Sequence, residues 1–88
     1  MTSYLVEAYT PVSPPLEDIK ARARRAANEL SRGPTPVRYV RSIYVPEDQT
    51  CFHLFEGPSV EAVRMASDLA GLSAQRIVEA LEGQGDRR

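Results

Sequence analysis

VRYVRSIYVPEDQTCFHLFE, residues 37–56, is the most strand-like part of this sequence. Both ends of the segment are rich in β-branched and aromatic side chains, and the PEDQ segment between them (46–49) has the composition of a turn. Two strand-like runs joined by a short turn predict an antiparallel hairpin. We therefore expect strands over residues 37–45 and 50–56.

The segments on either side of this hairpin each predict one more strand, and the first also predicts a helix. Residues 4–10 and 75–81 are rich in β-formers. Ser13 followed by Pro14 is typical of a helix start, and Gly33 follows the last apolar position of that helix. Apolar residues recur between them at steps of three and four, so one face of this helix should cover a sheet.

A second helix is predicted from its cap at Ser59 to its end at Gly71. The element order is then β-α-β-β-α-β, which is the ferredoxin-like pattern. We predict an α+β protein with a four-stranded antiparallel sheet and both helices on one face. The single domain is expected to span residues 1–82, and residues 83–88, which have no apolar side chain, to form a disordered tail.

Length and composition exclude several classes of protein. The 88 residues suffice for one small domain, and no run of about 18 apolar residues, as a membrane span needs, occurs in the chain. The 11 basic and 12 acidic residues nearly balance, which argues against a dedicated nucleic-acid binder. One cysteine gives no internal disulfide and no signal-peptide pattern begins the chain, so we expect a cytoplasmic protein without a membrane partner.

The two faces of the predicted sheet differ in character, because side chains alternate between the faces along each strand. One set is small and apolar and suits packing against helices: Val6, Ala8, Val40, Ser42, Phe52, Leu54, Val78 and Ala80. The other set combines large apolar residues with one ionisable residue per strand: Leu5, Glu7, Tyr9, Tyr39, Arg41, Ile43, Cys51, His53, Phe55, Ile77, Glu79 and Leu81. A contiguous apolar face marks an interface, so we expect a homodimer that closes sheet on sheet.

The four ionisable residues would then meet near the centre of the buried surface. One interpretation is a compensated cluster of ion pairs, because buried charges are usually paired. The other is a ligand-binding site in a cavity poor in water. The candidate ligand-binding residues are Glu7, Arg41, His53, Glu79, Tyr9 and Tyr39.

Two further alternatives use residues of the same face. Imidazole and thiolate suit nickel, zinc or copper, and carboxylates accept several metals, so a divalent transition metal is one candidate cofactor. The alternative is a cofactor-independent enzyme of the dimeric α+β-barrel kind, a monooxygenase, cyclase or isomerase, with His53 as acid or base and Arg41 as oxyanion partner. The sequence leaves open whether the protein is an enzyme. The candidate metal ligands are His53, Glu7, Glu79 and Cys51.

Five segments carry a resemblance to a known family: YLVE (4–7), VRSIYV (40–45), FHLFEGPS (52–59), EAVR (61–64) and AGLSAQRIVE (70–79). They resemble the small ferredoxin-like nickel-binding-protein family, which is also catalogued as a domain of unknown function. The resemblance implies a dimeric ferredoxin-like protein, with metal binding in some members.

The chain departs from the family pattern at positions that bear on metal binding. Family members often have histidine where this chain has Arg41 and Ala66, whereas Glu7 and Glu79 match acidic positions of the family. A guanidinium at position 41 would repel a cation and favours an anion or an internal salt bridge. We therefore expect a small dimeric ligand- or metal-binding-like protein in which the replaced histidines argue against nickel binding.

Overall fold

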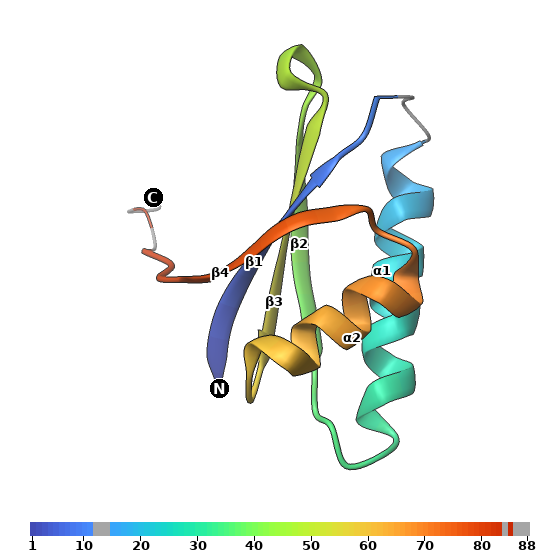
Figure 1. Ribbon diagram of the computed structural model, residues 1–88, viewed down its shortest axis with the longest axis vertical. Coiled ribbons are helices and arrows are strands. Elements are labelled where there is room, and N and C mark those ends of the chain that lie inside the picture. The colour runs from blue at the N-terminus through green and yellow to red at the C-terminus, as the bar shows by residue number, and fades with distance from the viewer. Residues whose placement is uncertain (12–14, 84, 86–88) are drawn as a thin grey trace.

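The computed structural model describes residues 1–11, 15–83 and 85 of the chain. Its elements are β1 (Thr2–Tyr9), α1 (Leu16–Ser31), β2 (Arg38–Val45), a short 3-10 helix η1 (Pro46–Asp48), β3 (Thr50–Gly57), α2 (Val60–Ala70) and β4 (Ala74–Ala80). Both helices lie on one side of the sheet, and the chain leaves β4 on the other side (Figure 1). The predicted ferredoxin-like α+β fold is confirmed.

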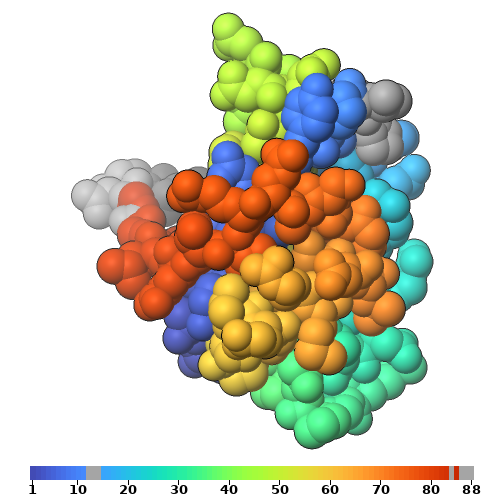
Figure 2. All heavy atoms as spheres, in the orientation of Figure 1, coloured from blue at the N-terminus to red at the C-terminus, as the bar shows by residue number. Residues whose placement is uncertain are grey.

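The sheet has the strand order β2-β3-β1-β4, and all three neighbouring pairs are antiparallel. β1 and β3 are therefore central strands, and β2 and β4 form the edges. The predicted hairpin joins β2 to β3 through η1, and Gln49 completes the turn in the left-handed conformation with φ of 51°. The tip of this hairpin projects beyond the rest of the molecule (Figures 1 and 2).

The two helices differ in how their ends are formed. The Ser59 side chain caps α2 by accepting a hydrogen bond from the backbone N–H of Ala62 at 3.2 Å, and Gly71 ends the helix with φ of 72°, as predicted. The predicted start of α1 at Ser13 and Pro14 lies outside the described residues; α1 begins at Leu16, directly after Pro15. No helix in the described part of the chain is long and apolar enough to cross a membrane.

The core lies between the sheet and the helices. Small side chains on the facing sides of the helices, such as Ala23 and Ala66, allow close approach, and the larger Phe55 and Val63 fill the space beneath them. Figure 2 shows the side chains of α2 and β4 closing the space that separates their ribbons on that side of the molecule. The sheet face away from the helices, which we call the open face, carries no helix (Figure 1).

The register of β3 differs from the predicted one. Residues directly opposite each other in an antiparallel pair share a face. His53 lies opposite the buried Val6, and Cys51 lies opposite the buried Ala8. The prediction that Cys51, His53 and Phe55 belong to the open face is therefore wrong, because all three point toward the helices and Phe52 and Leu54 take the open face instead. Since β3 is central and apolar on both sides, its alternation alone did not fix which side faces the helices.

Tyr39 and the residues of β4 also change faces, for different reasons. A bulge between Tyr39 and Arg41 sets Tyr39 opposite Phe55, on the helix side, while Arg41 stays on the open face opposite Leu54. In β4, Glu79 lies opposite Tyr4, which packs against the core on the helix side, but at this edge strand Glu79 is exposed. The same register turns Ile77 toward the helices and Val78 toward the open face, the reverse of the prediction. Of the four ionisable residues predicted to gather on one face, only Glu7 and Arg41 share the open face.

Candidate functional site

The charged residues of the open face form exposed ion pairs. Glu7 Oε1 lies 3.3 Å from Arg76 Nε, and the two side chains are 38% and 64% exposed, respectively. Arg41 pairs with Glu82, which follows β4 in the chain and so reaches across the sheet to β2. Such solvent-exposed pairs each contribute about 1 kcal/mol or less to stability. Neither Glu7 nor Arg41 therefore belongs to a buried charge cluster within one chain.

His53 is the buried polar residue of the sheet, with 1% of its surface exposed. It is also the sole histidine of the sequence. Its Nδ1 lies 2.6 Å from Ser42 Oγ, and Ser42 Oγ lies 2.6 Å from Tyr39 Oη, so the three side chains form a continuous hydrogen-bonded chain between β2 and β3. Cys51 Sγ approaches the same Nδ1 at 4.0 Å. The bulge in β2 makes this chain possible by turning Tyr39 toward the side that Ser42 occupies.

The protonation states of this cluster follow from its burial. Burial and, as the smaller cause, the nearby positive charge of Arg22 together lower the pKa of His53 from 6.5 to about 4. Burial also raises the pKa of the Cys51 thiol above its usual value. At neutral pH the imidazole is therefore uncharged and the thiol keeps its proton.

A pocket of about 140 Å³ lies beside His53 where four parts of the chain meet. The end of β1 contributes Ala8, Tyr9, Thr10 and Pro11, α1 contributes Ile19 and Arg22, β3 contributes His53, and the segment after α2 contributes Gly71, Leu72 and Ser73. Two of the predicted ligand-binding residues, His53 and Tyr9, line this pocket; Glu7, Arg41, Glu79 and Tyr39 do not.

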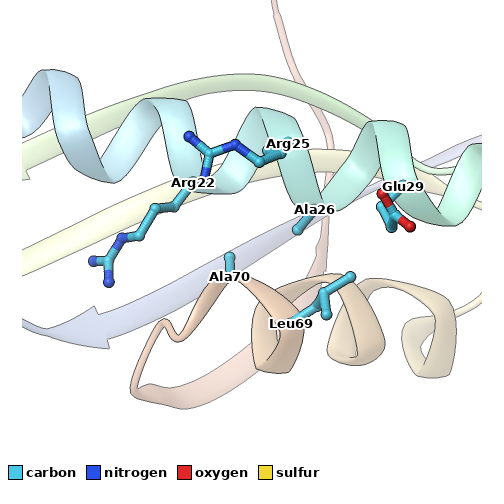
Figure 3. A pocket seen from close by; sticks show the side chains of 6 residues that line it. All are labelled: Arg22, Arg25, Ala26, Glu29, Leu69 and Ala70. Carbon is cyan, nitrogen blue, oxygen red and sulfur yellow. The ribbon is translucent and has the colours of Figure 1, made fainter.

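The pocket residue that sequence reasoning missed is Arg22. It belongs to a basic run on α1 (Lys20, Arg22, Arg24 and Arg25) and is exposed, and its side chain also lines both this pocket and a groove of about 330 Å³ between α1 and α2. Figure 3 shows its side chain extending toward the end of α2, away from Arg25. The signal in the sequence was its position between Ile19 and Ala23, both of which are buried. A residue at the edge of an apolar stripe can reach under the helix.

Arg22 differs from several other arginines in having no acidic partner among the residues that the structure describes. Four of them, Arg32, Arg38, Arg41 and Arg76, each form an ion pair with a glutamate. Within the described residues, Arg22 forms neither an ion pair nor a hydrogen bond. Its guanidinium therefore supplies a positive charge at the pocket that is exposed to solvent and pairs with no described carboxylate.

The predicted metal ligands do not assemble into a metal site. In the part of the chain that the structure describes, no group of three or more histidine, cysteine, aspartate or glutamate residues could hold a metal ion. Cys51 and His53 are neighbours beneath the helices, whereas Glu7 lies on the opposite face of the sheet. The residues present thus do not fit a metal held by one chain. The proposed catalytic residues of the enzyme alternative do not meet in one chain either, because the sheet separates His53 from Arg41.

This fold, with a polar pocket beneath its helices, defines a small ferredoxin-like α+β protein. The family model described as "Nickel responsive protein SCO4226-like" matches residues 4–80, and the chain belongs to that family. The resemblance seen in the sequence is thereby confirmed. The structure is similar to the crystal structure of SCO4226 from Streptomyces coelicolor A3(2), with a TM-score of 0.67, 21% sequence identity, and coverage of 93% of this chain and 99% of that one. No curated protein matches the chain.

Proposed function

We propose that the protein binds a small polar ligand in the pocket beside His53. The observation that carries this proposal is the meeting, at the same pocket, of a buried histidine and an exposed arginine that has no acidic partner among the described residues. The charge of Arg22 and the burial of His53 both oppose protonation of the ring, so the arrangement does not serve as an ion pair. Polar groups that converge on a pocket and have shifted pKa values are typical of binding sites.

The size of the pocket limits the ligand. A volume of about 140 Å³ corresponds to roughly five water molecules at about 30 Å³ each. A ligand of a few non-hydrogen atoms, or one small group of a larger ligand, therefore fits. The groove between the helices shares Arg22 with the pocket, so a larger ligand would extend in that direction (Figure 3).

Because the chain belongs to a family described as nickel responsive, we consider whether its residues could bind nickel. We infer that His53, Cys51, Glu7 and Glu79 of one chain do not form a nickel site. A metal needs deprotonated ligands, whereas burial keeps the proton on Cys51 and the Arg22 charge disfavours a cation beside His53. The proposed ligand is for these reasons an organic or inorganic molecule other than a bare metal ion.

A fragment screen by NMR tests the proposed function. Small polar compounds are added one at a time to uniformly ¹⁵N-labelled protein, and backbone resonances are followed. We expect at least one compound to shift the resonances of Thr10, His53 and Ser73, which come from three different sides of the pocket. The same shifts should weaken in Arg22→Ala and persist in Arg32→Ala, where a surface arginine paired with Glu29 is removed. Binding that is unaffected by Arg22→Ala, or shifts confined to other surfaces, would refute the proposal.

We also propose that two copies of the chain associate through the open face. Large apolar side chains remain exposed there in the single chain, including Ile43 at 56%, Tyr9 at 46% and Val78 at 37%. Phe52 and Leu54 lie between them in the central strand. A contiguous patch of this kind is unusual on a monomer and is suited to a second copy with the same face. The pairs that Arg38 forms with Glu56 and Arg41 with Glu82 would contribute to the polar rim of such an interface.

A further inference from the structure

We propose that the ligand of the His53 pocket is a small oxyanion, such as a carboxylate or phosphate group, held between the Arg22 guanidinium and a hydrogen carried by His53 Nε2. This inference rests on the proposed function and names its ligand class. Three independent features carry it: the direction of the hydrogen-bonded chain, the charge of the pocket lining, and the free edge of the imidazole.

The hydrogen-bonded chain determines which ring nitrogen of His53 carries the hydrogen. A hydroxyl donates one hydrogen, so the chain from Tyr39 through Ser42 to His53 must run in a single direction. Tyr39 Oη has no other hydrogen-bond partner among the described residues, so its hydrogen is used within the protein only if it donates to Ser42, and Ser42 then donates to Nδ1. The thiol of Cys51, which keeps its proton, faces the same nitrogen as a weak donor. Nδ1 is therefore an acceptor, and the neutral ring carries its hydrogen on Nε2.

The Nε2 edge of the ring is left facing the pocket. His53 lines the pocket, and its Nδ1 edge is occupied by Ser42 and Cys51. Nε2 forms no hydrogen bond with a described residue. In the described part of the chain, Ser67 Oγ alone is a fully buried side-chain polar atom without a partner, so Nε2 is not sealed in the interior. It therefore presents an N–H donor that needs an acceptor.

The rest of the pocket supplies positive charge and no negative charge. None of its lining residues is an aspartate or glutamate, and Arg22 has no acidic partner elsewhere in the described chain. Arg22 Nη1 lies close to Gly71, at 3.7 Å from where a Cβ would be, which leaves the guanidinium beside the pocket rim. A guanidinium together with an N–H donor matches the acceptor oxygens of a carboxylate or phosphate group. A cation meets no lone pair on Nε2 and is repelled by Arg22.

A titration of ¹⁵N-histidine-labelled protein tests this inference, since the sole histidine gives a single set of ring signals. The free protein should show the Nε2–H tautomer at pH 7. Acetate and inorganic phosphate should each shift the Nε2 signal in a saturable way at constant ionic strength, whereas acetamide, a neutral molecule of the size of acetate, should not. Arg22→Gln should weaken acetate binding by about tenfold or more, as expected for loss of a charge-assisted hydrogen bond, and Arg32→Gln should leave it within about twofold.

The outcomes separate the oxyanion inference from the proposed function. If acetamide shifts Nε2 and acetate does not, the pocket binds ligands but the oxyanion class is wrong. An Nδ1–H tautomer in the free protein would overturn the inference on its own, without any variant. If no fragment of any charge reaches Nε2, both the inference and the proposed function fail. Equal weakening by Arg22→Gln and Arg32→Gln would show that acetate responds to general surface charge, which also overturns the inference.

Discussion

Acidification from pH 6.5 to pH 4 is expected to decrease the free energy of unfolding by roughly 3 kcal/mol through His53 alone. The unfolded chain binds a proton at this histidine with a pKa near 6.5, whereas the folded chain binds it only near pH 4. As the pH falls between these values, protonation favours the unfolded state. Below about pH 4 both the folded and the unfolded chain carry the proton, and above about pH 6.5 neither chain carries it. The contribution of His53 to the free energy of unfolding therefore changes little outside this range.

The groups around His53 support this loss of stability on acidification. Arg22 approaches from α1, while Cys51, Ser42 and Tyr39 belong to the sheet; the segment after α2 contributes no charged residue to the pocket. No carboxylate among the described pocket residues is available to stabilise an imidazolium. The ring is therefore expected to stay neutral through the whole range in which an exposed histidine titrates.

Urea denaturation of wild type and His53→Asn at pH 4, 5, 6 and 7 measures the effect. Because the chain has one histidine, the difference in slope between the two proteins isolates His53 from the titrating carboxylates. The wild type should lose about 3 kcal/mol more than the variant over this range. NMR titration of the ring in folded wild type gives the same information if the variant does not fold. A ring that titrates near pH 6.5 in the folded protein would contradict its placement beneath the helices.

Ile43→Asp is expected to convert a dimer of twice 9.8 kDa into a monomer. Ile43 is exposed in the single chain and lies on the edge strand β2, opposite Phe52 of the apolar patch. A dimer interface of standard size covers about 800 Å² per partner, and an unpaired carboxylate buried in it costs several kcal/mol, enough to abolish association at micromolar concentration. The carboxylate costs little in the monomer, because position 43 is then in water.

Met65→Asp is the matched control, since Met65 is 50% exposed but lies on α2, on the helix side of the molecule. Light scattering during size-exclusion chromatography should give the dimer mass for wild type and for Met65→Asp, and the monomer mass for Ile43→Asp. A wild-type monomer at high micromolar concentration would contradict the association itself. If Met65→Asp dissociates the dimer and Ile43→Asp leaves the dimer intact, the interface lies on the helices instead.

The fold could be predicted from the sequence because each element has a local signal. Ser59 and Gly71 marked the ends of α2, and the turn at 46–49 marked the hairpin. The faces of the strands were harder to predict. Apolar residues occupy both sides of β3, so the side that meets the helices depends on its pairing with β1, a long-range contact.

The candidate site could be predicted only in part, for the same reason. His53 was recognised as a functional candidate, but the register of β3 moves it away from Glu7 and Arg41 and brings it to Arg22. Ser42 becomes its partner because the neighbouring strands set the two residues opposite each other. No local pattern in β2 predicted the bulge after Tyr39. The single extra residue of this bulge decides which face of the sheet the tyrosine side chain takes.

The most direct test of this account is the metal content of tag-free wild type and His53→Ala after dialysis against nickel and then against buffer, measured by mass spectrometry. We expect no stoichiometric nickel that depends on His53, because the ring is held neutral beside Arg22 with its hydrogen on Nε2, and no third ligand lies nearby among the described residues. One nickel per chain in the wild type that is lost in His53→Ala would contradict it.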